Sequence, residues 1–239
     1  MAILKEANIL FSGFTKETLE FFLSIRFNNN KEFMQAHRAE YLEQVRTPFY
    51  DLIDALAPRM LEISPEIEIR PHKCLSRIYR DIRFSRNKDP YRDHLWLAFR
   101  KAGVPKDGIP FYWFELSLEK VTWGLGVWGE NKAANEILRK KRVARPDDFL
   151  KLTKLVNKHH FALGGKAWQR LPLPDALPDF LHPWYKKREM YFEKVDIPFD
   201  CVFDETLVDL IAKDFLSLRP LYLMLKGCTE EAMELLESL

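Results

Sequence analysis

The chain has 239 residues, of which 47% are hydrophobic and 30% are charged, and its formal net charge is +2. This composition is typical of a globular protein and excludes a disordered or fibrous chain. The small net charge also excludes a strong overall electrostatic field.

Cysteine use and hydropathy favour a soluble intracellular protein. Three cysteines are present, at positions 74, 201 and 228, and none belongs to a Cys-x-x-Cys pair. An odd number of separated cysteines argues against a disulfide framework and against a structural zinc site. The sequence has neither the features of a signal peptide nor a long uninterrupted apolar run. We therefore expect a cytoplasmic protein with no membrane partner, no metal and no cofactor.

The first seventy residues have the apolar spacing of α-helices. Thr15 can cap a helix that begins at Lys16, and three asparagines at positions 28–30 end it, because their side chains compete for backbone hydrogen bonds. Asn30 can then cap a second helix, and Pro48 suits the first turn of a third. The third helix is predicted to turn five apolar side chains inward, namely Phe49, Leu52, Ile53, Leu56 and Met60.

A β-hairpin is predicted near the middle of the chain, after residues 64–110, which contain few long periodic runs. Residues 111–118 are rich in aromatics and alternate imperfectly, and residues 121–128 form the second strand. Glycines at positions 124, 126 and 129 indicate bulges or the close approach of another backbone. They also match the letters Gly-x-Gly-x-x-Gly. Because no second parallel strand is evident, a glycine-rich hairpin strand is preferred over a dinucleotide site.

Helices return in the C-terminal half of the sequence. They are predicted over residues 131–142, with Asn131 as the cap, and over residues 147–158. Short strands and turns are expected in residues 161–200. Asp204 can cap a further helix, whose apolar side chains again follow the helical period.

Two breaks are predicted near the C-terminus, at Pro220 and at Gly227, so that the last residues form separate helices. Helical N- and C-terminal segments therefore bracket a central, mostly antiparallel β-sheet. This order of elements indicates the α+β class. No repeat or interdomain linker is evident, and we expect residues 1–239 to form a single domain.

Basic residues are concentrated between positions 70 and 101, where ten Lys or Arg accompany three Asp. If this stretch is extended, Arg77 and Arg83 share one face with Asp81, whereas Arg80 falls on the apolar face between two isoleucines. An apolar face accommodates a guanidinium group only if the group is paired or reaches solvent. Arg80 is therefore predicted to be substantially buried and paired with a carboxylate.

The arginine segment resembles the signature of a known family. The run Arg77-Ile78-x-Arg80-Asp81-x-Arg83-Phe84-Ser85-x-x-Lys88-x-Pro90-Tyr91 is similar to the central motif of the domain of unknown function 2461 family. Weaker similarities lie in residues 27–33, 112–128, 170–172 and 182–183, so the resemblance covers about residues 11–236. One departure is Leu173-Pro174-Asp175, where the family pattern has a glycine. The resemblance implies a single α+β domain and implies no activity, substrate or cofactor.

The leading hypothesis is a cytosolic protein that binds an anionic small ligand, because several guanidinium forks can bind one phosphate or carboxylate. A competing interpretation is that these arginines brace loops by bonding backbone carbonyls and nearby acids. Asp81 is the one catalytic candidate, as a general base, although an orienting role for the arginines is preferred. The candidate ligand-binding residues are Arg77, Arg80 and Arg83, with Lys88 and Tyr91 at the rim.

Two further hypotheses come from other functional classes. A nucleic-acid-binding protein could use the basic runs 77–92 and 139–145, provided that they form one exposed positive surface. No helix-turn-helix or zinc pattern is present, so sequence-specific DNA binding is not expected. The other alternative is a non-catalytic scaffold or interaction protein in which the arginine network is purely structural.

Overall fold

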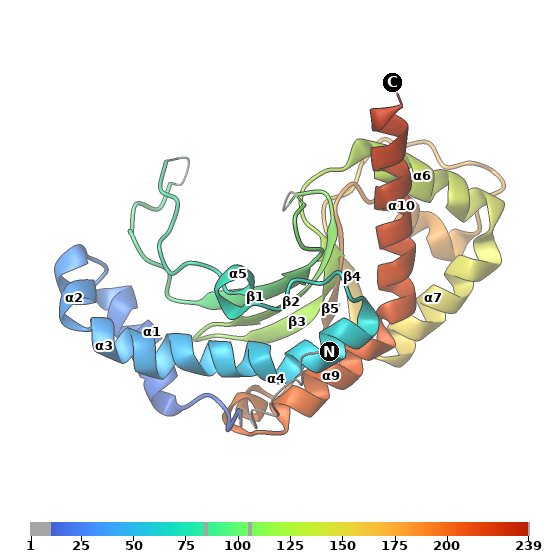
Figure 1. The fold of residues 1–239 in the computed structure, drawn as a ribbon. Coiled ribbons are helices and arrows are strands. Elements are labelled where there is room, and N and C mark those ends of the chain that lie inside the picture. The colour runs from blue at the N-terminus through green and yellow to red at the C-terminus, as the bar shows by residue number, and fades with distance from the viewer. Residues whose placement is uncertain (1–10, 84–85, 105–106, 239) are drawn as a thin grey trace.

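The computed structural model describes residues 11–83, 86–104 and 107–238 and shows an α+β fold (Figure 1). Its centre is a five-stranded antiparallel sheet with the strand order β1-β2-β3-β5-β4. The prediction of helical terminal segments around an antiparallel sheet is confirmed. The strands are β1 (Leu95–Arg100), β2 (Pro110–Leu116), β3 (Val121–Val127), β4 (Phe161–Gly164) and β5 (Met190–Lys194).

Helices precede, interrupt and follow the sheet in the sequence. The first group is α1 (Lys16–Phe27), α2 (Lys31–Ala36), α3 (Arg38–Glu40), a π-helical turn at Tyr41–Arg46, α4 (Thr47–Ile63) and the short α5 (Pro71–Cys74). The middle group is α6 (Lys132–Ala144), α7 (Pro146–Lys158) and α8 (His182–Tyr185), with a 3₁₀ turn at Asp179–Leu181. The last group is a 3₁₀ turn at Phe199–Phe203, α9 (Leu207–Ser217) and α10 (Arg219–Glu237).

The local signals at several helix starts are confirmed. Asn30 accepts a hydrogen bond from the Phe33 backbone N–H at 2.8 Å, and Asn131 accepts one from Ala134 at 3.0 Å. These side chains satisfy backbone donors that have no partner inside the helix. Pro48 lies in the first turn of α4, where its missing N–H costs no helical hydrogen bond.

Two predictions near the C-terminus are wrong. Gly227 does not break the chain, because α10 continues unbroken from Arg219 to Glu237. A helical glycine costs only about 1 kcal/mol relative to alanine, and the buried side of α10 outweighs that cost. Asp204 does not cap α9 directly. Its carboxylate accepts a hydrogen bond from the Thr206 backbone at 2.7 Å, in a turn before the helix begins at Leu207.

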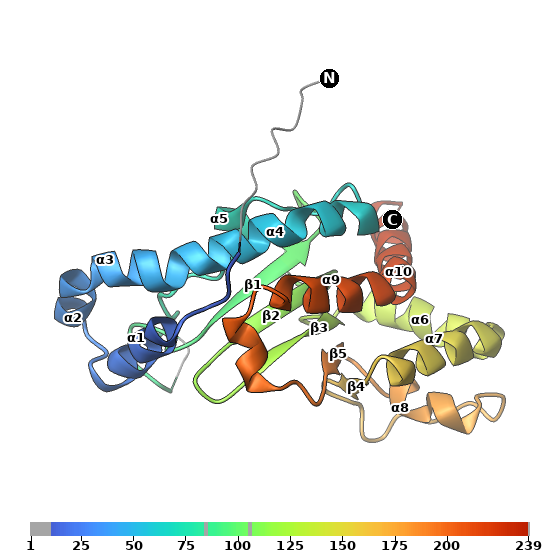
Figure 2. The same ribbon diagram turned by 90° about the horizontal axis from the view of Figure 1, so that it is seen from below.

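One face of the sheet forms the hydrophobic core with α4, α9 and α10 (Figures 1 and 2). Alternate residues of β2, namely Tyr112, Phe114 and Leu116, are fully buried on this side. The ring of Phe114 stacks on that of Phe14 with centroids 5.9 Å apart, and the ring of Phe49 from α4 lies 4.9 Å from Phe14. The N-terminal helices are thereby fixed against the middle of the sheet.

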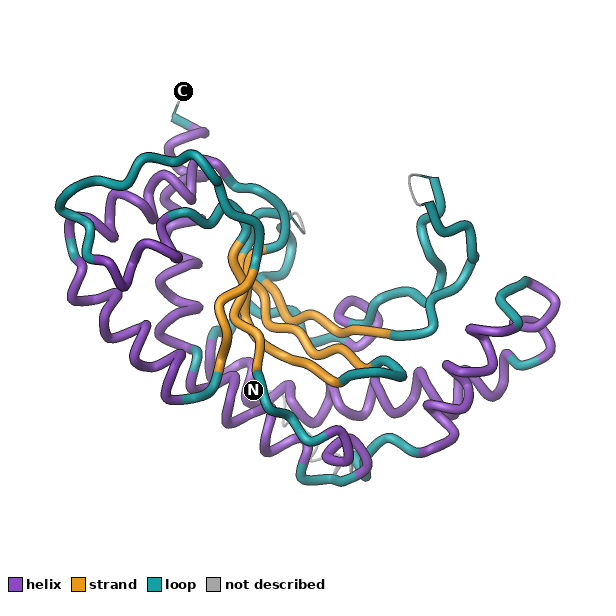
Figure 3. Tube along the Cα trace, turned by 180° about the vertical axis from the view of Figure 1, so that it is seen from behind, coloured by secondary structure: helices purple, strands orange, loops and turns teal. Residues whose placement is uncertain are grey.

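Between α5 and β1 the chain makes an excursion that folds back on itself. Ser76 donates its backbone N–H to the Trp96 carbonyl, Arg80 to the Pro90 carbonyl, and Arg92 to the Ile78 carbonyl, each at 2.8 Å. We call residues 77–92 the arm. Figures 1 and 3 show that the described part of the arm rises from one end of the sheet, away from the core helices.

The second face of the sheet has no long helix across it in the described part of the chain. Figures 1 and 3 show this open face on the inner side of a crescent, with the arm at one end and α10 at the other. Its side chains are the alternate residues that point away from the core. Across β1, β2, β3 and β5 they are Trp96, Ala98, Arg100, Phe111, Trp113, Glu115, Thr122, Gly124, Gly126, Tyr191 and Glu193.

Candidate functional site

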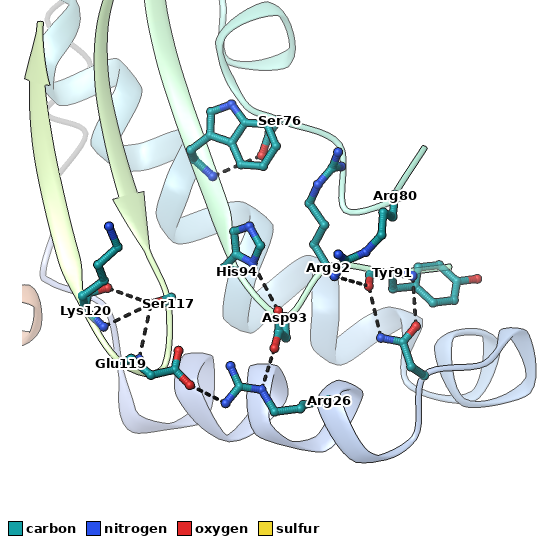
Figure 4. Close-up of polar contacts among 12 residues, drawn as sticks. Arg26, Ser76, Arg80, Tyr91, Arg92, Asp93, His94, Ser117, Glu119 and Lys120 are labelled. Carbon is teal, nitrogen blue, oxygen red and sulfur yellow. Dashed lines mark hydrogen bonds and ion pairs between the residues drawn. The ribbon is translucent and has the colours of Figure 1, made fainter. Parts of the chain in front are cut away.

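The base of the arm is fixed to the N-terminal helices by polar contacts. Asn29, in the turn between α1 and α2, bonds the backbone of Tyr91 twice: its amide donates to the Tyr91 carbonyl at 3.1 Å and its oxygen accepts from the Tyr91 N–H at 2.9 Å. Arg26 of α1 forms ion pairs with Asp93, at 2.5 Å, and with Glu119 (Figure 4). The base of the arm therefore has a defined position relative to the sheet.

Arg92 is the central arginine of this base. Its Nη1 donates to the backbone carbonyls of Arg77, at 2.6 Å, and Tyr79, at 2.5 Å, and its guanidinium group lies 4.7 Å from the ring centre of Trp96. Burial lowers the pKa of Arg92, and the charges of Arg80 and Arg77 lower it further. The guanidinium groups of Arg80 and Arg77 are therefore close enough to repel that of Arg92.

Arg80 differs from its prediction. It is half-buried rather than substantially buried, and its Nη2 lies 3.5 Å from the Tyr91 carbonyl instead of a carboxylate. Its Nε is buried and has no hydrogen-bond partner in the described structure. The predicted carboxylate partner was wrong because the backbone of the returning half of the arm is the nearest acceptor.

Arg83 and Asp81 form an exposed pair farther along the arm. The Asp81 carboxylate accepts from Arg83 Nη2 at 2.7 Å and from Nε at 3.0 Å. These hydrogen bonds lower the pKa of Asp81 to about 2, so that it is ionised and weakly basic at neutral pH. This geometry favours an orienting role over general-base catalysis.

The remaining candidate residues are divided between the outer arm and its base. Lys88 is exposed and donates to the Ile82 carbonyl at 2.9 Å. Tyr91 is only 3% exposed, and its ring lies 5.1 Å from that of Tyr79, which is 54% exposed. Phe84 and Ser85 of the motif lie outside the described residues. Thus Arg77, Arg80 and Tyr91 lie together at the base, with Arg92 beside them, whereas Arg83 and Lys88 belong to the outer arm.

The open face next to Arg92 carries aromatic rings above glycines. A Cβ atom at Gly124 would come within 2.6 Å of the Trp113 ring, and one at Gly126 within 2.5 Å of Tyr191. The glycines therefore let these aromatic residues approach the sheet closely. This arrangement confirms the glycine-rich hairpin strand, because β3 lies between two antiparallel neighbours and is not part of the parallel βαβ unit that a dinucleotide site requires.

A buried hydroxyl without a partner also belongs to the open face. Thr122 is 3% exposed, and its Oγ1 has no hydrogen-bond partner among the residues described. It pairs in register with Glu115, whose neighbour on the other side is Trp96. Polar and aromatic groups thus continue from the base of the arm onto the sheet.

The second basic run does not join the arm. Residues 139–145 lie at the end of α6 and just beyond it, and Figures 1 and 2 place α6 at the opposite end of the molecule from the arm. Within the run, Arg142 is buried and Lys141 forms an ion pair with Glu231 at 2.6 Å. The two runs therefore do not form the single exposed surface that the nucleic-acid hypothesis requires.

The described residues lack the signatures of a metal site and of a membrane span. No cluster of three or more His, Cys, Asp or Glu side chains suited to a metal ion occurs in residues 11–83, 86–104 and 107–238. None of the helices described there combines the length and apolar character needed to cross a membrane. All three cysteines are free thiols, and burial raises the pKa of Cys74 to about 12.

Sequence reasoning missed three residues that define this site. Arg92 belonged to the basic run 77–92 but was not selected as a ligand. Asn29 was interpreted as part of a helix stop and of a weak family similarity, with no role at the site. Trp96 lies in β1, a strand that was not predicted. The only hint of the Arg92–Trp96 contact in the sequence is that the two residues are four positions apart. This spacing can be interpreted only when the paired geometry of the arm is known.

The comparisons with known proteins agree with the motif. No curated protein matches the chain. A family model described as a conserved hypothetical protein, DUF2461, matches residues 17–223. This match begins one residue inside α1, includes the other helices up to α9, the whole arm and the sheet, and ends early in α10. The chain therefore belongs to the DUF2461 family.

Proposed function

We propose that the protein binds an anionic small ligand, bearing a phosphate or carboxylate group, at the base of the arm. The observation that carries this proposal is the convergence of Arg77, Arg80 and Arg92. None of the three forms an ion pair with a carboxylate within the described residues. A cluster of positive charges that lacks a carboxylate ion pair favours an external anion.

Arg92 is preorganised for this role. Two backbone carbonyls hold its Nη1, and Trp96 supports one face of the guanidinium plane. Its Nε and Nη2 have no acceptor among the described residues and can form a bidentate contact with an oxyanion. Arg80 adds a buried Nε without a partner, so a ligand oxygen at this point would satisfy groups that are otherwise costly to bury.

The aromatic rings around the arginines suit a ligand that contains a planar group. Tyr79 is half exposed, and His94 stacks on Trp96 with centroids 5.9 Å apart. Aromatic surfaces beside guanidinium groups favour a planar body joined to the anion. Phosphate-bearing metabolites of the cytoplasm, where we place the protein, are the natural candidates. The outer residues Arg83 and Lys88 would then contact only a longer ligand.

A thermal-shift screen of phosphorylated metabolites tests the proposal, followed by calorimetric titration of the best compound. Arg80→Gln and Arg92→Gln should each weaken binding at least about tenfold, because a hydrogen bond to a charged group contributes about 1.5–3 kcal/mol. Arg86→Gln is the matched control, since Arg86 is an exposed arginine of the same arm. Binding that is retained in both Arg80→Gln and Arg92→Gln would exclude this site.

A further inference from the structure

A second concentration of unpaired positive charge lies inside the molecule, between α6 and the segment that follows α8. Arg142 of α6 is only 2% exposed. Its Nη2 lies 3.5 Å from the Met190 sulfur, and its guanidinium carbon lies 5.5 Å from the ring centre of Phe149. Its Nε is buried and has no hydrogen-bond partner in the part of the chain that is described.

Among the described residues, none supplies a compensating negative charge to Arg142. Burial, together with the smaller effect of the neighbouring Arg139, lowers the pKa of Arg142 to about 9. A pKa of about 9 still leaves the guanidinium group charged at neutral pH. The groups that act in the opposite direction are Cys228 and Tyr185, and no carboxylate of the described chain lies within ion-pairing distance. A buried charge without a counter-ion destabilises a fold strongly.

Two further arginines of this region also have a buried nitrogen without a hydrogen-bond partner in the described structure. Arg139 lies one turn before Arg142 on α6, and its Nη2 is buried without a partner in the described structure. Arg188 contributes a buried Nε in the same state, with its guanidinium group over Trp168 at 5.2 Å. The segment is held against α6 by Arg139 Nε, which donates to the Tyr185 carbonyl at 3.3 Å, and by Asn135, which donates to the Arg188 carbonyl at 2.7 Å.

A groove opens beside these arginines. Its volume is about 350 Å³, and its walls are Glu136, Arg139, Lys140, Val143 and Ala144 of α6 together with Tyr185. Figure 2 shows α6 and α8 at the same end of the molecule, far from α1 and α2 and from the base of the arm. A groove of this size accommodates an oxyanion with a small substituent. Its lining supplies the two cations Arg139 and Lys140, the carboxylate of Glu136, a phenol and two apolar side chains, Val143 and Ala144.

We propose that this groove is a second anion site, which takes inorganic phosphate or a phosphate monoester. Arg139 and Lys140 contact the oxyanion directly, and Arg142 stands behind Arg139 and supplies a charge that the anion neutralises. The site is independent of the one at the base of the arm, because the two share no residue and lie at opposite ends of the molecule.

Thermal unfolding in inorganic phosphate, compared with chloride at equal ionic strength, tests this inference. Phosphate at about ten times its Kd should raise the wild-type melting temperature by about 3–6 °C. Arg139→Gln and Arg142→Met should remove the phosphate-specific rise. Arg145→Gln is the matched control, because Arg145 is exposed just beyond the end of α6. Arg80→Gln should also keep most of the rise, which separates this site from the arm.

The variants also distinguish a ligand site from a purely structural arginine. Without phosphate, Arg142→Met should be as stable as the wild type or more stable, since an apolar side chain of similar length removes an uncompensated buried charge. A clear loss of stability in phosphate-free buffer would assign Arg142 to the fold and overturn the inference. A phosphate effect that equals the chloride effect, or that persists in Arg139→Gln, would overturn it as well. If Arg142→Met does not fold, Arg139→Gln alone decides.

Discussion

Single side chains hold the base of the arm in position. Asn29 satisfies both backbone groups of Tyr91, although the two residues are 62 positions apart in the sequence. Arg26 joins Asp93 and Glu119, so α1 contacts the base of the arm and the β2–β3 turn at once (Figure 4). The arginines at the base are therefore placed by residues outside the motif itself.

Asn29→Ala should loosen the arm without unfolding the protein. Two hydrogen bonds to the Tyr91 backbone disappear, which should lower the free energy of unfolding by about 1–2 kcal/mol. The Tyr91 amide, whose hydrogen is donated to Asn29, should exchange faster in hydrogen–deuterium exchange. Asn28→Ala serves as the control, because the Asn28 side chain bonds only the Ser24 carbonyl in α1. Unchanged exchange at Tyr91 in Asn29→Ala would contradict the assigned role.

Strand β3 depends on glycine at the positions where it meets its neighbours. A Cβ atom at Gly124 would lie 1.9 Å from the Phe192 carbonyl oxygen and 2.6 Å from the Trp113 ring. The backbone of β5 cannot move aside without breaking its pairing with β3. The Trp113 ring cannot move aside without leaving the open face. The rings of the open face and the pairing of β3 with β5 therefore require the same glycine.

Gly124→Ala should destabilise the protein by more than about 3 kcal/mol, because the substitution forces overpacking between paired strands. Chemical denaturation followed by tryptophan fluorescence measures the change. A loss below about 1 kcal/mol would show that β3 and β5 can separate at little cost and that the close packing is not essential.

Gly227→Ala is the opposite case and should stabilise the protein by about 0.5–1 kcal/mol. Gly227 lies in the interior of α10, where a Cβ atom would have no heavy atom within 4 Å. Alanine has the higher helix propensity and restricts the unfolded chain. The same denaturation experiment measures the gain, and a loss of stability would indicate that α10 needs flexibility at this position.

Helices and the central hairpin were predictable, whereas β1 and the arm were not. The caps at Asn30 and Asn131 are local signals, and the structure shows both hydrogen bonds. Strand β1 reads Leu-Trp-Leu-Ala-Phe-Arg, a nearly continuous apolar run whose period does not distinguish strand from helix. Pairing with β2 makes this segment a strand rather than a helix, and the sequence of the segment alone does not reveal that pairing.

The candidate site was only partly predictable for a related reason. Alternation correctly separated the exposed Arg77 from the buried Ile78, because that part of the arm is extended and paired. The partners of Arg80 and Arg92 are backbone carbonyls of the arm itself. Which carbonyl comes close depends on how the arm folds back, and residue types do not encode that directly.

Four ion pairs form a ring that joins three segments of the chain that are distant in the sequence. Glu66 follows α4, Lys101 follows β1, and Lys226 and Glu230 lie on α10. Lys101 lies 3.2 Å from Glu66 and 2.8 Å from Glu230, and Lys226 lies 2.8 Å from Glu66 and 2.9 Å from Glu230. Each of the four charges thus has two opposite neighbours. An isolated surface pair contributes little, but a network of this kind contributes more.

This ring should make stability depend on pH in the acid range. Hydrogen bonds from Lys226 and Lys101 lower the pKa of Glu66. Burial acts to raise the pKa of Glu230, but its hydrogen bonds from the same lysines outweigh burial and lower the pKa below its ordinary value of 4.5. A carboxyl with a lowered pKa binds protons more readily in the unfolded chain. Its stabilising contribution is therefore complete above about pH 4.5 and is lost as the pH falls through the lower folded-state value.

Urea denaturation between pH 7 and pH 3 measures this contribution as a difference between proteins. The wild type should lose stability on acidification, and the Glu66→Gln/Glu230→Gln double variant should lose about 1 kcal/mol less, because the pairs are partly exposed and solvent screens them. Glu237→Gln is the control, since Glu237 ends α10 beyond the ring and should leave the wild-type pH dependence unchanged. If the double variant and the wild type lose the same amount, the ring does not hold α10 to the rest of the molecule, and apolar contacts such as that between Tyr112 and Tyr222 must suffice.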